Sequence, residues 1–168
     1  GDVKVDHAVM QVAAEALSLR LSAQLREKSG LTYDVNASTV TRYGTRALVV
    51  CSRFASPSTQ AGLEQLLQVI DTSGTQGFTD DELASASRLV ASSWERASTS
   101  LDGLTSAWTT ALGARQAFEP EKGSLAALAV TPEAVRAIAP KMLQSRQFQL
   151  VLSGDRGPNQ RRGRLVLE

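Results

Sequence analysis

The sequence is poor in the residues that build metal and thiol sites, with one histidine, His7, and one cysteine, Cys51, among 168 residues. The zinc motifs H-x-x-E-H and H-E-x-x-H each need two histidines on one helical face. A cysteine-rich zinc site needs several cysteines, and an internal disulfide needs two. None of these sites can therefore form within this chain. Because Cys51 lies in an apolar, strand-like run, we expect it to be a small buried side chain.

Several other chemistries are also missing. The sequence has no phosphate-binding loop, no dinucleotide fingerprint and no G-x-S-x-G elbow. A serine triad would have to use His7 as its base, and a solvated residue at a helix start is the simpler interpretation. Eighteen basic and seventeen acidic residues leave a net charge of +1, which favours neither nucleic acid nor an anionic membrane as partner. No apolar run approaches the ~20 residues that span a bilayer.

Hydrophobic periodicity predicts a long first helix followed by two strands. Residues 6–28 carry an apolar stripe at helical spacing, and Gly30 supplies a stop. The stripe consists of Val9, Val12, Ala13, Ala16, Leu17, Leu21 and Leu25. Residues 33–42 and 45–54 are predicted to be strands joined by a turn at 43–44. The apolar block 47–51 is typical of a strand covered on both faces.

The rest of the chain predicts four helices and a closing strand. The helices are expected to begin at Ser56-Pro57, at a capping box formed by Thr79 and Glu82, near Thr99, and at Thr131-Pro132, the last reaching about Met142. The first of these helices should be ended by Gly74 and Gly77. Trp94 and Trp108 should be core anchors on their helices. Residues 148–153 are predicted to be the last strand.

The resulting order, α-β-β-α-α-α-α-β, predicts an α+β domain with a largely antiparallel sheet and helices packed on one face. The domain should occupy residues 1–155. Residues 156–168 are basic and rich in polar residues, so we expect them to form a flexible tail. Because the chain has no initiator methionine, we expect residue 1 to be a boundary within a longer product.

The stretch from Arg20 to Val35 resembles the second, zinc-less domain of pitrilysin-type metallopeptidases, the family that includes insulin-degrading enzyme and the mitochondrial processing peptidase. That domain carries S-R-L-x-x-x-L-R-E-x-x-G-L-x-Y-x-V, and this chain matches it in register. The matching residues are Leu25, Arg26, Glu27, Gly30, Leu31, Tyr33 and Val35. Three further stretches, 78–83, 130–135 and 150–155, are similar to family motifs in the same order, whereas Leu19 and Asp34 depart from the pattern.

This resemblance implies the LuxS/MPP-like metallohydrolase fold, with its usual first strand missing here. It also implies that Arg26 binds peptide substrate, and that Tyr33 binds substrate and supports the oxyanion in trans. Zinc and the H-x-x-E-H motif would belong to a partner domain or subunit, and the chain itself would hold no cofactor. A homodimer is also compatible with the family, and the compartment stays open between bacterial cytoplasm and periplasm.

Other interpretations of the same residues stay open. Arg26 is also suited to interact with the negative end of its helix, and Tyr33 is compatible with an ordinary strand aromatic. Domains of this family also serve as non-catalytic scaffolds in larger assemblies. The arginines of the tail, Arg156, Arg161, Arg162 and Arg164, could touch phosphates, but no aromatic pattern accompanies them.

The isolated chain is expected to hydrolyse no peptide. Without two histidines it cannot position a zinc-bound water for attack on a peptide carbonyl. The test is to incubate the purified 168-residue chain, with and without added Zn²⁺, with a mixture of unfolded peptides and to follow cleavage by mass spectrometry. Robust cleavage by the metal-free chain would overturn the prediction.

Overall fold

The computed structural model describes residues 6–42, 45–113 and 117–154. The elements, in chain order, are α1 (His7–Leu21), the π-helix η1 (Ser22–Lys28), β1 (Thr32–Arg42), β2 (Thr45–Phe54), the 3₁₀ turn η2 (Ser56–Ser58), α2 (Thr59–Gln76), α3 (Asp80–Ala97), α4 (Leu101–Gly113), α5 (Pro120–Leu128), α6 (Pro132–Met142) and the 3₁₀ turn η3 (Ser145–Gln147). None of these helices is both long and apolar enough to cross a membrane.

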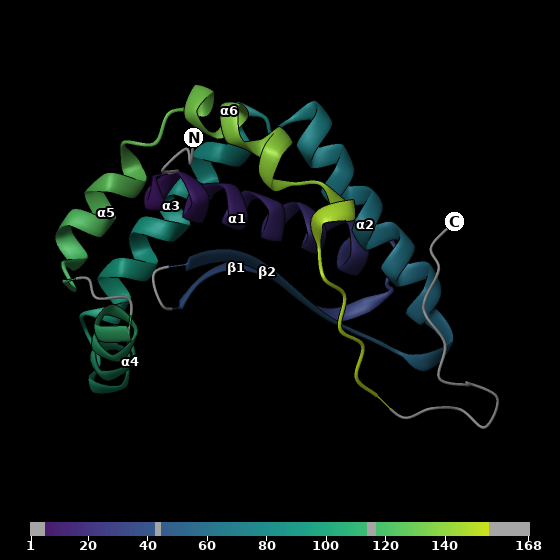
Figure 1. The fold of residues 1–168 in the computed structure, drawn as a ribbon, viewed down its shortest axis with the longest axis horizontal. Helices are drawn as coiled ribbons and strands as arrows, with labels where there is room; N and C mark the ends of the chain where they lie inside the picture. Colours follow the sequence, from purple (N-terminus) through teal and green to yellow (C-terminus); the bar gives the residue numbers. More distant parts are fainter. Residues whose placement is uncertain (1–5, 43–44, 114–116, 155–168) are drawn as a thin grey trace.

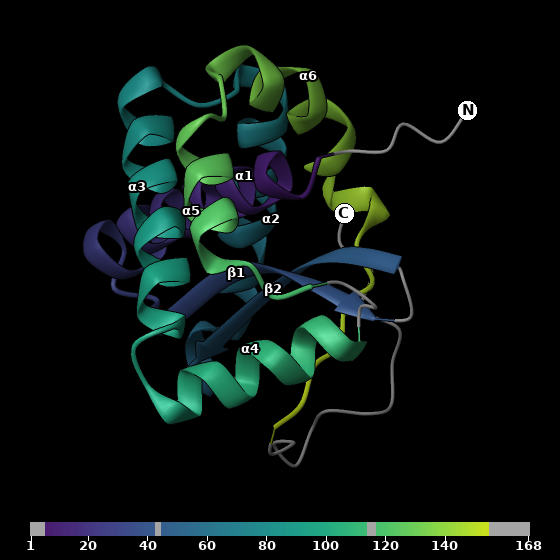
Figure 2. The same cartoon turned by 90° about the vertical axis from the view of Figure 1, so that its left-hand side faces the viewer.

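The helices form a layer over one side of a two-stranded hairpin (Figures 1 and 2). Helix α1 runs along the hairpin and contacts β1, with α2, α3, α5 and α6 around it. Helix α4 departs from this layer and runs below the hairpin (Figure 2). The predicted α+β class is confirmed. The prediction that the helices pack on one face of the sheet does not hold for α4.

Helix α1 is the centre of the core. The predicted stripe from Val9 to Leu25 is buried along its whole length, and all of its members except Val9 are 0% exposed. Asp6 caps the helix start by accepting a hydrogen bond of 3.0 Å from the Ala8 amide. The final part of the predicted helix 6–28 is a π-helix, which the hydrophobic spacing did not indicate.

Strands β1 and β2 pair antiparallel, with Ala37 opposite Val50. One face of the hairpin packs on the helical core through such residues as Val35, Leu48 and Val50. Burial along β2 alternates strictly, so the prediction of a strand covered on both faces is wrong. For the same reason Cys51 is exposed rather than buried. The predicted turn at 43–44 lies outside the described residues.

The predicted closing strand at 148–153 is wrong, because this segment pairs with no strand in the described part of the chain. Its side chains Leu150, Val151 and Leu152 are exposed, and an apolar segment forms a strand only where a neighbouring strand pairs with it. The sheet of the described residues therefore has two strands rather than the larger sheet we expected. The predicted tail 156–168 lies outside the described residues.

Two further helix predictions and one prediction of a core side chain differ from the structure. Helix α5 was missed, although Pro120 at its first turn is a start signal. Gly74 does not end α2; it lies within it, where a Cβ would come within 2.1 Å of the Leu143 carbonyl oxygen, and the helix ends at Gly77. Trp94 packs against the core as expected, whereas Trp108 is 51% exposed and forms an edge-to-face pair with Phe118.

One arginine links three helices. Arg20, near the end of α1, donates two hydrogen bonds to the Glu82 carboxylate, from Nε to Oε1 at 2.9 Å and from Nη2 to Oε2 at 2.6 Å. Its Nη1 donates to the Gly77 carbonyl oxygen at 2.8 Å and to Ser73 Oγ at 3.1 Å. The guanidinium also lies 4.5 Å from the centre of the Phe78 ring. We call this set of contacts the Arg20 clamp.

Glu82 takes part in both the clamp and the start of α3. The predicted capping box is confirmed: the Thr79 amide donates to Glu82 Oε2 at 2.8 Å and the Glu82 amide donates to Thr79 Oγ1 at 3.2 Å. Burial raises the pKa of the Glu82 carboxyl, but the hydrogen bonds from Arg20 and Thr79 outweigh it and hold the pKa below its ordinary value of 4.5. The carboxylate form is thus the one that the fold stabilises.

Replacing Glu82 by glutamine should lower the free energy of unfolding by about 1–3 kcal/mol at neutral pH, because Arg20 loses a charged partner. A lowered folded-state pKa stabilises the fold above the unfolded-state value and ceases to do so as pH falls through the folded-state value. The difference between wild type and Glu82→Gln should therefore be full at pH 6 and shrink below about pH 4.5. Urea unfolding across pH 3–7 measures it.

The matched control is Glu133→Gln, which removes a carboxylate that is 78% exposed and 3.7 Å from Arg136. Exposed pairs of this kind contribute little, so the control should change stability by less than about 1 kcal/mol. Equal losses in the two variants, or a Glu82→Gln effect that does not depend on pH, would contradict the role of the clamp.

Candidate functional site

The candidate site begins at η1, the π-helical continuation of α1. Its wider turns are closed by hydrogen bonds from the Ser29 amide to the Gln24 carbonyl at 3.2 Å and from the Leu31 amide to the Leu25 carbonyl at 2.9 Å. Leu25 is fully buried, and Arg26 next to it is exposed. The segment thus anchors itself by one leucine and presents Arg26 to solvent. Short π-helical segments of this kind are frequent at functional sites.

Gly30 then turns the chain from η1 into β1. Its φ of +61° lies in the left-handed region, which glycine adopts without steric cost. The predicted stop at this residue is confirmed. Only six residues separate Arg26 from Tyr33, and η1 packs against β1, so the two side chains come from adjoining segments.

Tyr33 is displayed by an irregularity in the strand pairing. Thr32 is paired with Phe54 and Asp34 with Arg53, so Tyr33 is the extra residue of a β-bulge. The side chain is 92% exposed, the highest exposure among the large apolar and aromatic residues of the described chain. Bulges commonly redirect a side chain beside functional sites, and this one turns an aromatic ring fully into solvent.

Arg26 and Tyr33 share two properties that matter for binding. Both are exposed, and neither side chain has a hydrogen bond or ion pair with any residue that the structure describes. Arg26 is therefore not committed to an ion pair on its own helix, and Tyr33 is not a packed strand aromatic. Their predicted roles toward substrate stay a prediction. We refer to Arg26, Tyr33 and Arg53, exposed residues of the adjoining segments η1, β1 and β2, as the rim.

Two contacts lie beside the rim. On one side, Gln65 of α2 donates a hydrogen bond of 2.8 Å to the hydroxyl of Ser29, at the end of η1. On the other, Arg53 of β2 lies 3.8 Å from the Asp34 carboxylate, with both side chains largely exposed. An exposed pair at that distance is weak, so Arg53 is available to a ligand at little energetic cost.

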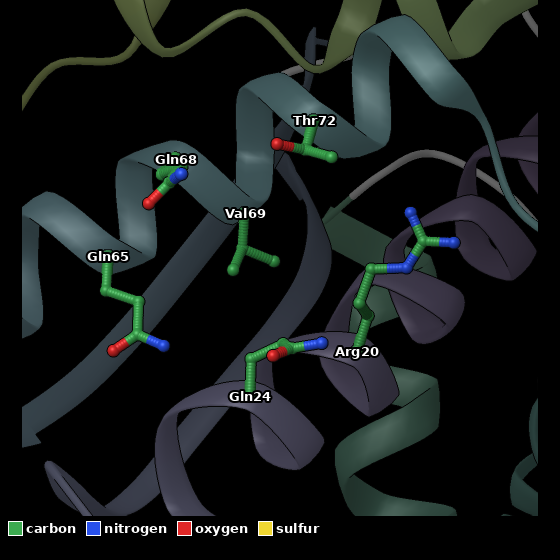
Figure 3. A pocket seen from close by; sticks show the side chains of 6 residues that line it. All are labelled: Arg20, Gln24, Gln65, Gln68, Val69 and Thr72. Atoms are coloured by element: carbon green, nitrogen blue, oxygen red, sulfur yellow. The ribbon is translucent and has the colours of Figure 1, made fainter. Parts of the chain in front are cut away.

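A pocket of about 220 Å³ lies beside the rim, between the end of α1 and α2 (Figure 3). Its lining is mostly uncharged and polar, and Arg20 contributes to it. The lining residues are Arg20, Gln24, Gln65, Gln68, Val69 and Thr72. The guanidinium of Arg20 is already engaged in the clamp, so the pocket offers amides and a hydroxyl but no general base or nucleophile.

The titratable groups with shifted pKa values lie outside the rim. Burial, and then Arg46, lowers the pKa of His7, while Asp6 acts in the opposite direction. Burial raises the pKa of Glu15 against the effect of Arg96. His7 is half-buried rather than solvated as predicted, and its Nδ1 has no hydrogen-bond partner in the described structure.

Metal ligands do not gather in the described part of the chain: it contains no group of three or more histidine, cysteine, aspartate or glutamate side chains placed to hold an ion. The rim can bind and orient a ligand through charge and hydrogen bonds, but it brings no group that activates water.

Comparison with known proteins supports the resemblance seen in the sequence. The family model described as the peptidase M16 inactive domain matches residues 2–90, just over half of the chain. The crystal structure of a peptidase M16 inactive domain from Pseudomonas fluorescens matches with a TM-score of 0.66 and 24% identity. The match covers 83% of this chain and 35% of that chain, and at this identity it concerns the fold. A search of curated proteins found no match.

Replacing Gly30 by alanine should lower the free energy of unfolding by about 1–2 kcal/mol, because a Cβ makes the left-handed conformation costly. No atom lies within 4 Å of that Cβ position, so the loss would reflect backbone strain alone. Gly30→Asn should lose less, since asparagine tolerates this conformation better. Urea unfolding of the three proteins measures the order, and an alanine variant as stable as wild type would contradict the assigned conformation.

Proposed function

The chain belongs to the peptidase M16 inactive-domain family, the zinc-less domain of pitrilysin-type peptidases, and from that premise we propose that it contributes substrate contacts to a two-part zinc peptidase. In this proposal a zinc-bearing domain or subunit with H-x-x-E-H faces the rim across a cavity. An extended peptide lies between the two halves. Zinc in the partner half would activate the attacking water.

The observation that carries the proposal is the display of Tyr33. A tyrosine with 92% of its side chain exposed, placed at a bulge, gains nothing for the stability of this domain. Its phenol is a hydrogen-bond donor on a rigid ring, and as the side chain has only two rotatable bonds, little entropy is lost on binding. A surface ring of this kind is typical of a residue that meets a ligand.

The rim offers two complementary contacts to a peptide. The Tyr33 hydroxyl can donate a hydrogen bond to a carbonyl oxygen that gains negative charge when water attacks. Arg26 offers a planar, permanently charged fork to carbonyl or carboxylate oxygens of the same peptide. The two groups would have different roles. Arg26 would bind the substrate in both the ground state and the transition state, whereas Tyr33 would act chiefly in the transition state.

The scaffold role is the competing proposal. A domain that only completes an assembly needs its core and its contact surface, but not an exposed guanidinium and an exposed phenol that have no partner among the described residues. The two roles therefore differ in how the assembled enzyme responds to changes at the rim.

The test uses the chain assembled with its zinc-bearing half, which is recognised by H-x-x-E-H on the same polypeptide or a neighbouring gene. Tyr33→Phe should lower kcat by about 10²–10³-fold, as for other oxyanion donors. Arg26→Ala should chiefly raise KM, because it removes binding common to both states. Lys28→Ala, an exposed cation two residues from Arg26, is the matched control and should leave both constants within about twofold.

Assembly must be verified for each variant by size-exclusion chromatography, so that a loss of turnover is not a loss of the complex. If Tyr33→Phe and Arg26→Ala both assemble and turn over peptide at the wild-type rate, the catalytic contribution is wrong and the scaffold role stands.

A further inference from the structure

We propose that Thr32 and Ser52 are positioning residues: their hydroxyl groups hold the β-bulge that presents Tyr33 to the substrate. This inference rests on the proposed function, because it assigns a role to Tyr33 that the bulge serves. Neither hydroxyl touches the substrate in this proposal. Both act through the backbone on either side of Tyr33.

The bulge decides which side chains of β1 face the core. Thr32 is 4% exposed and Ala37 is 2% exposed, although they are five residues apart along one strand. In a regular strand, residues an odd number apart point to opposite faces. The single extra residue at Tyr33 reverses this phase, so Thr32 before it and Val35 and Ala37 after it all point inward. The alternation of inward and outward side chains along β1 therefore shifts by one residue at Tyr33.

A β-bulge interrupts the ladder of backbone hydrogen bonds between two strands. Here the hydroxyl groups of Thr32 and Ser52 form hydrogen bonds with backbone groups beside the bulge. Thr32 Oγ1 lies 2.5 Å from the Arg53 carbonyl oxygen and 2.9 Å from that of Asp34, and it accepts a hydrogen bond of 3.2 Å from the Asp34 amide. Ser52 Oγ lies 3.1 Å from both Thr32 Oγ1 and the Asp34 carbonyl oxygen. With one proton each, the two hydroxyls can serve both carbonyls at once.

These contacts bracket Tyr33. The residue before it, Thr32, is fixed by its buried side chain, and the residue after it, Asp34, is held at both its amide and its carbonyl. The Asp34–Arg53 ion pair cannot substitute, because it is exposed and its atoms are 3.8 Å apart. The direction of the Tyr33 side chain is therefore set by two neutral hydroxyls on neighbouring strands.

The first experiment measures the bulge in the chain itself. Thr32→Val keeps the shape of the side chain and removes its hydroxyl, Ser52→Ala removes the second hydroxyl, and Thr32→Ser restores a hydroxyl at the first position. In NMR spectra of the ¹⁵N-labelled chain, the amide signals of Tyr33 and Asp34 should shift in Thr32→Val and Ser52→Ala and stay close to wild type in Thr32→Ser. Circular dichroism verifies the fold, and if Thr32→Val does not fold, Ser52→Ala carries the test.

The second experiment measures turnover in the assembly with the zinc-bearing half. Thr32→Val should lower kcat by about tenfold or more, since small misplacements of a catalytic group are costly, and should leave KM nearly unchanged. Thr32→Ser should recover most of the loss. In the Tyr33→Phe background, Thr32→Val should cause no further loss beyond about twofold, because the group that it positions has been removed.

The outcomes separate this proposal from the proposed function. If Tyr33→Phe leaves kcat unchanged, the catalytic role of Tyr33 is wrong and the positioning role fails with it. If Tyr33→Phe lowers kcat but Thr32→Val and Ser52→Ala do not, only the positioning role is wrong. Losses from Thr32→Val and Tyr33→Phe that multiply in the double variant would also overturn it, because they would show that Thr32 acts independently of Tyr33.

Discussion

The Arg20 clamp is the interaction on which the arrangement of the helices depends. A single guanidinium binds a carboxylate at the start of α3, a carbonyl at the end of α2 and a buried hydroxyl within α2, and it stacks on Phe78 between them. An arginine whose side chain is only 17% exposed needs such a set of partners, since an unpaired buried charge is strongly unfavourable. The clamp fixes the end of α1 relative to its neighbours, one residue before the buried Leu21 and two before η1 begins.

Between Arg20 and Tyr33, thirteen residues later, the polar side chains change from internally hydrogen-bonded to exposed. The Arg20 side chain makes its hydrogen bonds inside the domain. The Arg26 side chain makes none with the described residues and is exposed. The same contrast holds within β1: Thr32 is buried and its hydroxyl is hydrogen-bonded, and Tyr33 next to it is exposed. Arg26 and Tyr33 thus each follow a buried residue, Leu25 and Thr32, which allows a surface contact to be precise without being buried.

The sequence predicted the helices well and the sheet poorly, and particular residues show why. The stripe from Val9 to Leu25 and the box of Thr79 and Glu82 are local patterns, complete within one helix, and both were confirmed. Residues 148–153 also carry a clear local pattern, but a strand requires a partner, and no described strand pairs with them. Cys51 and Trp108 were assigned to the core from apolar neighbours, whereas exposure depends on which other element covers that face.

The sequence by itself determined that the chain holds no zinc motif, because that follows from residue identity and spacing. Its resemblance to the zinc-less domain of a peptidase family singled out Arg26 and Tyr33. Only the tertiary structure decided that Tyr33 is the extra residue of a bulge, that Arg20 rather than Arg26 is bound internally, and that η1 is π-helical. These depend on strand register and on contacts between residues up to 62 positions apart, and such contacts form only when the elements pack together.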